Sequence, residues 1–598
     1  MKAYYNSWDE NFKQPFGAVK INQTITWRII VDDPKVQVYL QLARVGDQEV
    51  ANPMQQHDGS TWEYQLSLIK PGLYYYYFEI HHQGKTIWAG RNDLGQIALT
   101  DDYDQLQKFQ LTCYQFENPT PDWYRHGIAY QIFPDRFFNG HPHKEITGRK
   151  PNSFLYATEQ DQPYYIKNSD GEIVRWDFYG GNIAGIQAKI PYLKSLGVTI
   201  LYLNPIFAAT SNHRYDTNDF FTIDPMLGSE AEFKELVTSL HQNGIHLILD
   251  GVFNHVGEDS IYFNAHQLYG PNTGASQNQH SPYYSWFKFT HYPDKYASWW
   301  GVSNLPEVNK ADPSYQDFIY GNQGVLHKWD QLGVDGWRLD VADELPMDFL
   351  RQLRHRERIE GNQVLIGEVW EDASNKYVGN ELRTYPNGDN LSGTMNYPVR
   401  SFITNYLCQP DATKTMTDYL ALIENYPREF MENCLNNIGT HDTIRIKTAL
   451  NNDEQLVQIA FAMLFMLPGV PCLYYGDEAG LVGAKDPDNR RFFPWDQINQ
   501  TIQATVKCWI KRRQLDVLLV TGDIGLAYDK QGHLIIIRYQ DHQADLLLIN
   551  PLECSWTVDP HQLTYLHLPA TICDQLGHFF NGKTSRRKTK SIYKTIKN

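Results

Sequence analysis

The feature that most constrains the fold is a unit in which an amphipathic helix, a glycine and an apolar strand follow one another. In the clearest copy, Ser229 and Glu232 predict a capping box, and Gly244 separates the helix from the run IHLILDGVFNH. Two further copies lead through Gly197 to VTILYLNPIF and through Gly333 to VDGWRLDV. Because these strands are apolar throughout, both of their faces must be covered, which predicts an α/β fold with a parallel sheet flanked by helices.

Periodicity alone leaves open whether this sheet is flat or closed into a barrel. Polar residues gather where the predicted strands end, at Asn204, at residues 250–255, at Arg338 and at Asp340. This arrangement is typical of the active end of a (β/α)8 TIM barrel, which we predict over residues 119–515. No GxGxxG or GxxxxGK[ST] motif follows these strands, which argues against a nucleotide site.

Two β-domains are predicted to flank the barrel. Residues 1–118 contain the runs TITWRIIV, KVQVYLQLARV, TWEYQLSLI and GLYYYYFEIHH, separated by turn formers, which indicates an antiparallel β-sandwich. Strand-like runs return after about residue 514, as LLVTGDIGLAYD, HLIIIRYQ and ADLLLINP. They predict a smaller C-terminal antiparallel β-domain over residues 516–598, which ends in a basic tail to which no function is assigned.

Charge and composition exclude several classes of partner. The net charge of −16 argues against binding to nucleic acid or to an anionic membrane surface. No run approaches the roughly 18 apolar residues of a membrane span, and the first residues contain no signal-like apolar stretch. The seven cysteines are scattered without CxxC spacing, which predicts neither a disulfide framework nor a zinc site. A cytoplasmic protein is therefore expected.

Two carboxyl groups, those of Asp340 and Glu368, lie at the ends of predicted strands. Retaining glycoside hydrolysis requires two carboxyls about 5–5.5 Å apart, one as nucleophile and one as proton donor. Arg338 and Asp340 lie on the same face of one strand, where the arginine can keep the carboxylate ionised. Glu368 ends another apolar strand beside Trp370, so a raised pKa would suit it as the donor. A structural salt bridge and a solvated carboxylate remain the alternatives for these residues.

A third strand end carries His441 and Asp442, in NNIGTHDT. A histidine and a second carboxylate can hold sugar hydroxyls and distort the ring toward an oxocarbenium-like state. The alternative for Asp442 is the N-cap of a helix.

Taken together, these segments resemble the α-amylase family of glycoside hydrolases. The segments GVTILYLNPIF, DGVFNH, LPEVN, GWRLDVADE, GEVWED, NNIGTHD and GVPCLYYGDEAG occur in family order, and the resemblance covers roughly residues 118–515. It implies that Asp340 is the nucleophile, Glu368 the acid/base and Asp442 the stabiliser of the transition state. It also implies the sugar-contacting residues, which are Tyr215, His255, Arg338, Trp370, His441, Asp486 and Arg490.

Within that family the chain is similar to the neopullulanase, cyclomaltodextrinase and maltogenic amylase group. The N-terminal sandwich, the LPEVN segment and the VADE tail of GWRLDVADE support this. The resemblance implies hydrolysis of α-1,4 and also α-1,6 bonds in maltodextrins, cyclodextrins or pullulan, with transfer to sugar acceptors. It further implies a homodimer formed through a carbohydrate-binding-like N-terminal domain, and a small domain at residues 256–313, inserted after the third barrel strand.

The sequence departs from the group at several positions. Asp343 stands where the group usually has Asn, and Glu371 where it often has His. The loop FFNGHPHKEI and the turn GGN, which ends at Asn182, stand where related enzymes have an Asp-rich NGD-type loop and a GGD turn that bind calcium. We therefore expect no required cofactor and a weak or absent calcium site.

Two other functions are compatible with the same scaffold. One is an oligo-1,6-glucosidase or a glucan transferase, although such enzymes commonly lack the N-terminal sandwich. The other is a non-catalytic glucan-binding protein, which would be expected to have lost at least one of Asp340, Glu368 and Asp442. All three are present.

Overall fold

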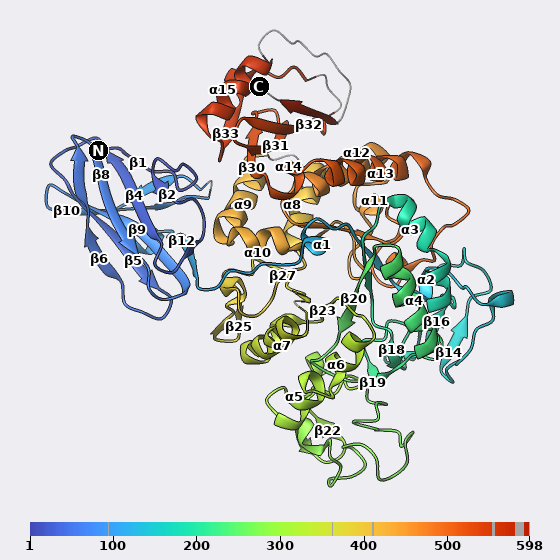
Figure 1. The fold of residues 1–598 in the computed structure, drawn as a ribbon. Coiled ribbons are helices and arrows are strands. Elements are labelled where there is room, and N and C mark those ends of the chain that lie inside the picture. Colours follow the sequence, from blue (N-terminus) through green and yellow to red (C-terminus); the bar gives the residue numbers. More distant parts are fainter. Residues whose placement is uncertain (94, 362, 410–411, 553–555, 581–590, 597–598) are drawn as a thin grey trace.

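The centre of the molecule is a closed barrel of eight parallel strands. The computed structural model describes residues 1–598 except 94, 362, 410–411, 553–555, 581–590 and 597–598 (Figure 1). The barrel strands are β13 (Ala129–Ile132), β17 (Ile200–Leu203), β20 (His246–Gly251), β23 (Gly336–Leu339), β24 (Val364–Gly367), β27 (Gly393–Thr394), β28 (Leu435–Asn437) and β29 (Val470–Tyr474). They pair in parallel in the order β27-β24-β23-β20-β17-β13-β29-β28, and a bridge from Met395 to Leu435 joins the two end strands and closes the ring. The predicted (β/α)8 barrel is confirmed.

Helices surround the barrel, and all of them except α1 come after its first strand in the chain (Figure 1). They are α1 (Asp122–Arg125), α2 (Ile183–Ala188), α3 (Ile190–Leu196), α4 (Glu230–Gln242), α5 (Pro313–Tyr320), α6 (Val325–Gln331), α7 (Met347–Glu360), α8 (Tyr397–Cys408), α9 (Ala412–Asn425), α10 (Arg428–Asn433), α11 (Ile446–Ala449), α12 (Glu454–Met466) and α13 (Gln500–Leu515). The predicted capping box of Ser229 and Glu232 is present at the start of α4. The apolar stripe before Gly197 belongs to two helices, which meet at Lys189, because Pro191 has no N–H with which to continue α2.

The N-terminal domain consists of two packed sheets. One contains β1 (Ala3–Tyr4), β2 (Lys13–Gln14), β4 (Thr24–Val31), β7 (Gln55–Asp58) and β8 (Thr61–Ser67). The other contains β3 (Val19–Lys20), β5 (Gln37–Arg44), β6 (Val50–Pro53), β9 (Gly72–His82), β10 (Lys85–Arg91), β11 (Ile97–Thr100) and β12 (Phe109–Tyr114). Trp27 of β4 and Phe78 of β9 lie in one buried cluster between the sheets. The pairing is antiparallel except between β12 and β3.

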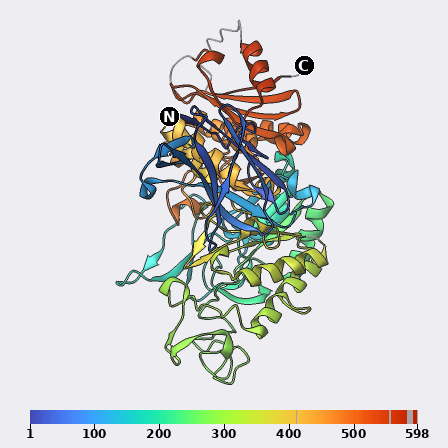
Figure 2. The ribbon, with the colours of Figure 1, turned by 90° about the vertical axis from the view of Figure 1, so that its left-hand side faces the viewer.

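The C-terminal domain is a five-stranded antiparallel sheet covered by α15 (Ala570–Phe580). Its strands are β30 (Asp523–Tyr528), β31 (Leu534–Gln540), β32 (Gln543–Ile549), β33 (Thr564–Leu566) and β34 (Ser591–Ile596). The first residues of the predicted strand LLVTGDIGLAYD are instead helical, forming α14 (Leu518–Thr521). Much of the predicted basic tail, residues 583–590 and 597–598, lies outside the described residues. Figure 2 shows this domain above the barrel, with the N-terminal sandwich facing the viewer.

Long excursions leave the barrel at the carboxyl ends of its strands. Residues 252–312, between β20 and α5, form the lower lobe of Figure 1 and contain only β21 (Phe289–His291) and β22 (Lys295–Tyr296) as strands. Shorter excursions carry β14 (Ser153–Leu155), β15 (Ile166–Lys167) and β16 (Ile173–Phe178), then β18 (Phe207–Ala209) and β19 (Thr217–Ile223), and finally β25 (Tyr377–Val378) and β26 (Glu381–Leu382). None of the helices in the described part of the chain has the length and apolar character of a membrane-spanning segment.

Candidate active site

One buried arginine brings three carboxylates together at the end of β23. Arg338 Nη1 lies 2.8 Å from Asp250 Oδ1 and 3.0 Å from Asp340 Oδ1, and its Nη2 lies 3.0 Å from Glu368 Oε2. The arginine side chain has no solvent exposure. Asp340 and Glu368 therefore face the same guanidinium group from neighbouring strands, as a nucleophile and a proton donor must.

The turn after β23 fixes the position of Glu368. Val341 adopts left-handed backbone angles, φ 39° and ψ 52°, which a β-branched residue rarely does. In this conformation its backbone N–H donates to Glu368 Oε2 at 2.8 Å. The indole Nε1 of Trp370 donates to the other oxygen, Oε1, at 3.0 Å. Both oxygens of Glu368 are therefore held by the protein.

Burial and the neighbouring carboxylates raise the pKa values of Asp340 and Asp442. We expected Arg338 to keep the pKa of Asp340 low, but burial and the neighbouring Glu368 outweigh the arginine and raise it well above its usual range. Burial and Glu368 also raise the pKa of Asp442 to about 7, although Arg490 and Arg338 oppose this. Positive charge offsets burial only in part, because Asp250 shares the same guanidinium. Such a cluster retains a proton near neutral pH, which a proton donor needs.

Tyr215 and His441 form one wall of the site. Their rings lie parallel, 5.3 Å apart at 10°, and the Tyr215 hydroxyl is 2.6 Å from His441 Nε2. Burial, with Arg490 and Arg338 nearby, lowers the pKa of His441 well below its usual value, so the ring is neutral. Because the Gln131 side-chain amide contacts Nδ1 as a donor at 3.0 Å, the ring proton lies on Nε2. That nitrogen is 3.1 Å from Asp442 Oδ2.

The outer predicted residues continue this network. Arg490 contacts Asp486 at 2.9 Å, approaches Asp442 at 3.7 Å and donates to the backbone carbonyl of His441 at 3.0 Å. Trp370 is 45% exposed and its ring stacks on Tyr397 at 3.8 Å. Nine of the ten predicted residues are therefore joined by direct contacts among themselves or through Asp250.

His255 is buried beside this network and stacks on Trp299, with ring centroids 5.2 Å apart. Burial and the positive charge of Lys310 lower its pKa to about 3, so His255 is neutral at physiological pH. A neutral imidazole in this position can donate one hydrogen bond and accept another, which suits a sugar hydroxyl.

Sequence reasoning missed several members of the site. Asp250 accepts hydrogen bonds from Tyr202 at 2.7 Å and from Tyr215 at 2.9 Å in addition to binding Arg338. Its place at a strand end was the available signal. Lys376 contacts Asp343 at 3.2 Å and also pairs with Glu371, so one lysine balances both departures from the family pattern. No spacing in the sequence points to that contact.

The loops at which we expected little or no calcium binding are tied together by amide groups. Asn182 Oδ1 caps α2 by accepting from the Gly185 N–H at 2.7 Å and also accepts from the Gly140 N–H at 3.0 Å. Its amide nitrogen donates to Asn139 Oδ1 at 2.9 Å. The amide oxygens that a cation could use therefore already accept hydrogen bonds within the protein.

Comparison with known proteins places this site in a family. The family model for the α-amylase catalytic domain matches residues 131–516. The chain is 34% identical over 604 residues to an amylopullulanase of Thermoanaerobacter thermohydrosulfuricus, covering 88% of this chain and 40% of the relative. It is 32% identical over 444 residues to a cyclomaltodextrinase of Geobacillus thermopakistaniensis, covering 72% of this chain and 69% of the relative.

Solved structures agree with this result. A cyclomaltodextrinase superimposes with a TM-score of 0.66 at 26% identity, over 93% of this chain and 92% of that chain. The matches span 31% to 45% of the length of three related amylopullulanases. The expected resemblance is confirmed, and the chain belongs to the α-amylase family.

Proposed function

We propose that the chain is a retaining α-glucan hydrolase acting on maltodextrins, cyclodextrins or pullulan. It would cleave α-1,4 bonds and also α-1,6 bonds, and transfer part of its product to sugar acceptors. The observation that carries the proposal is that Asp340 and Glu368 both contact Arg338 at 3.0 Å from neighbouring strand ends. The names of the relatives, an amylopullulanase and a cyclomaltodextrinase, support this substrate class.

The reaction proceeds in two steps. The Asp340 carboxylate attacks the anomeric carbon while Glu368 gives its proton to the leaving glycosidic oxygen, so the C–O bond breaks as the bond to Asp340 forms. Glu368, now a carboxylate, removes a proton from water or a sugar hydroxyl, which attacks the same carbon and displaces Asp340. Tyr215, His441 and Asp442 would hold the distorted sugar during both steps.

Two substitutions test these roles. We expect Asp340→Asn and Glu368→Gln each to lower kcat by roughly a thousandfold or more, because each removes a group that acts in the transition state. Unchanged circular dichroism and gel-filtration profiles would show that folding is intact. Either variant retaining near-normal turnover would remove that residue from the mechanism. Product released with inverted anomeric configuration, measured by NMR in the first minutes of the reaction, would overturn the two-step route.

A substrate panel tests the specificity. Purified protein would be incubated separately with β-cyclodextrin, pullulan, soluble starch and maltotriose, and the products identified by chromatography. We expect ring opening of the cyclodextrin to be faster than cleavage of starch. Fast starch cleavage with slow ring opening would instead indicate an ordinary α-amylase. Exclusive cleavage of α-1,6 bonds in short oligosaccharides would indicate an oligo-1,6-glucosidase.

We also propose a cytoplasmic homodimer that needs no metal for catalysis. Among the described residues six cysteines are free, which fits a reducing compartment. Light scattering after gel filtration should give twice the monomer mass of 69.4 kDa. Dialysis against EDTA should leave glucan hydrolysis unchanged, whereas loss of activity that calcium restores would contradict this part of the proposal.

A further inference from the structure

The most exposed tryptophan of the described chain lies on the lower lobe. Trp300 is 83% exposed and has a positive φ of 49°. Residues other than glycine seldom adopt this backbone conformation. The indole N–H groups of Trp299 and Trp300 both donate to Glu344 Oε1, at 3.0 and 2.7 Å. Because the Trp300 ring is exposed, its burial cannot be what compensates for the positive φ. A strained, exposed aromatic that is nevertheless held in place indicates a binding role.

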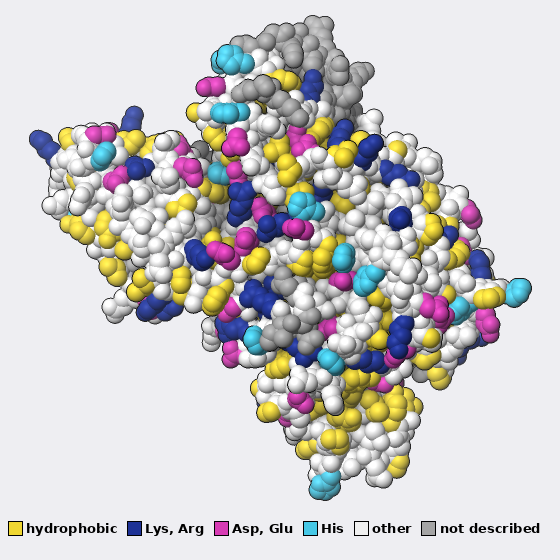
Figure 3. Space-filling view, viewed as in Figure 1, with side chains coloured by type: hydrophobic (Ala, Val, Ile, Leu, Met, Phe, Trp, Pro, Cys, Tyr) yellow, Lys and Arg dark blue, Asp and Glu magenta, His cyan; other side chains and the backbone are white. Residues whose placement is uncertain are grey.

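Glu344 connects this pair to the active site. It lies four residues after Asp340 and accepts a hydrogen bond from Asn254 at 3.0 Å through its other oxygen. Asn254 precedes His255, on which the Trp299 ring stacks. Figure 3 shows hydrophobic side chains gathered on this lobe, around the position of β22. The large hydrophobic side chains exposed within residues 252–312 are Leu268, Tyr269, Trp300 and Val302.

We propose that Trp299 and Trp300, clamped by Glu344, form a stacking platform for glucose units of the substrate that lie beyond the scissile bond. This inference rests on the proposed glucan hydrolase function. Indole faces bind the apolar faces of sugar rings, and the clamp holds the indoles in place before the substrate arrives. A long or cyclic glucan reaches the platform, whereas a short one does not. The platform therefore determines chain-length preference rather than catalysis.

The test compares substrates of different length. In Trp300→Ala, kcat/KM for maltoheptaose and β-cyclodextrin should fall by about tenfold through KM, while kcat/KM for maltotriose stays within twofold. Leu515→Ala, which truncates a residue 77% exposed at the end of α13, is the matched control and should change neither. Glu344→Ala should reproduce the Trp300 effect. Glu344→Gln keeps an acceptor oxygen for the indoles and should largely restore the wild-type ratio.

Equal losses on short and long substrates, or no loss on either, would overturn the platform. If the wild-type chain hydrolyses no glucan, the proposed function fails first. The platform is then judged separately by calorimetric titration of maltoheptaose into the wild type and Trp300→Ala. Equal affinity of the two proteins would reject the platform in that case.

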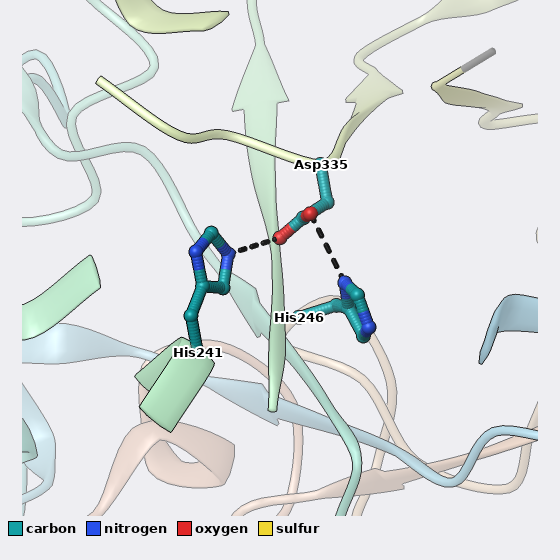
Figure 4. Close-up of side chains that lie close together, drawn as sticks. All are labelled: His241, His246 and Asp335. Carbon is teal, nitrogen blue, oxygen red and sulfur yellow. Dashed lines mark hydrogen bonds and ion pairs between the residues drawn. The ribbon is translucent and has the colours of Figure 1, made fainter. Parts of the chain in front are cut away.

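A second site lies at the opposite end of the barrel strands. Figure 4 shows His241, at the end of α4, and His246, at the start of β20, pointing toward Asp335, which precedes β23. His241 Nε2 is 2.8 Å from Asp335 Oδ2, and His246 Nδ1 is 3.0 Å from Oδ1. One potential ligand atom from each residue lies within 4.8 Å of the other two. Among the described residues, this is the one group of three His, Cys, Asp or Glu side chains close enough together to hold a metal ion.

We infer that this cluster binds a divalent transition cation such as Zn²⁺. Two imidazoles and one carboxylate are ligands that zinc prefers, and the partly exposed His241 leaves room for a water as fourth ligand. Asp335 Oδ2 also accepts from the Leu247 N–H at 2.8 Å, which orients the carboxylate. A bound ion would join α4 to β20 and β23 at the end remote from the catalytic carboxylates. Its effect would therefore be on stability rather than on turnover.

Zinc titration tests the site. Protein freed of metal by chelation should bind one equivalent of Zn²⁺ in calorimetry and melt at a higher temperature in its presence. His246→Ala and Asp335→Asn should each lose both effects. His266→Ala, which removes a histidine that is 62% exposed and pairs with Asp259, should retain them. Absence of saturable binding by the wild type, or equal binding by His246→Ala, would show that the three residues form hydrogen bonds only.

Discussion

At the residue scale, the site is governed by an excess of carboxylates over positive charge. Asp250, Asp340 and Glu368 share Arg338, and Asp442 has Arg490 only at 3.7 Å. Burial strengthens the repulsion among them, because water does not screen it. Both acid/base chemistry and stability should therefore depend on pH in the neutral range.

The stability of Asp442→Asn should exceed that of the wild type at pH 8 but not at pH 4. The pKa of Asp442 is raised from 3.8 to about 7 in the folded protein. Between these pH values the folded chain binds more protons than the unfolded chain, so the free energy of unfolding falls as pH rises. Above pH 7 the buried carboxylate is ionised and the whole destabilisation is present. Since the side chain is 29% exposed, the gain should be on the order of 1 kcal/mol. Melting curves at the two pH values would measure it, with Asp418→Asn, at an exposed position of α9, as control. An equal shift at both pH values would contradict the explanation.

Lys376→Met should lower stability by about 1–2 kcal/mol, because Asp343 and Glu371 lose their shared cation. Burial raises the pKa of Asp343, and Lys376 opposes this by stabilising the ionised carboxylate. The loss of stability in Lys376→Met should therefore be larger at pH 8, where Asp343 is ionised, than at pH 5. Adding Asp343→Asn should recover most of it, since the amide needs no counter-charge. A double-mutant cycle by thermal unfolding would measure the coupling. Additive effects of the two substitutions would show that the lysine acts elsewhere.

The same residues show what a sequence can reveal about a site. Asp340, Glu368 and Asp442 could be found because each follows a barrel strand inside a motif. The roles of Asp250 and Lys376 could not, because their partners are set by three-dimensional packing. Asp250 meets an arginine 88 positions away, and Lys376 meets Asp343 across two loops. The pKa of Asp340 was predicted in the wrong direction, because the sequence showed the neighbouring arginine but not how completely the fold buries the carboxyl group beside Glu368.

At the element scale, local rules were reliable where they involve neighbouring residues. The capping box of α4 and the bounds of β4 and β9 follow from a few adjacent side chains. Long-range pairing was harder to anticipate, as the parallel contact of β12 with β3 shows. The turn after β23 also depends on a long-range contact, because the backbone N–H of the left-handed Val341 donates to Glu368.

Val341→Gly should therefore make the protein more stable and less active. Glycine removes the Cβ that disfavours left-handed angles, which should raise stability by roughly 1 kcal/mol. The freer backbone would hold Glu368 less firmly, so kcat should fall severalfold while KM changes little. Thermal unfolding and steady-state kinetics would measure both. Val341→Ala keeps a Cβ and should not stabilise. A glycine variant with lower stability would mean that the turn is unstrained.

At the scale of the whole molecule, the N-terminal sandwich is fastened to the barrel by buried polar contacts. Trp8 Nε1 donates to Glu424 Oε2 at 2.9 Å, and Arg91 approaches the same oxygen at 4.0 Å. Gln110 donates to Ser374 Oγ at 2.7 Å. A cavity of about 910 Å³ lies where the two β-domains meet the barrel, and Trp8 is part of its lining.

Glu424→Ala should loosen the sandwich without altering the catalytic carboxylates. It leaves the Trp8 indole and Arg91 without their shared acceptor, which should cost about 1–3 kcal/mol. Limited proteolysis should then cut the connection near residues 115–121 faster than in the wild type, while kcat on maltotriose changes little. Asp47→Ala removes an exposed ion pair with Arg44 inside the sandwich and should leave the cleavage rate unchanged. If Glu424→Ala is cut no faster than Asp47→Ala, the apolar packing between the domains, rather than this carboxylate, holds the sandwich in place.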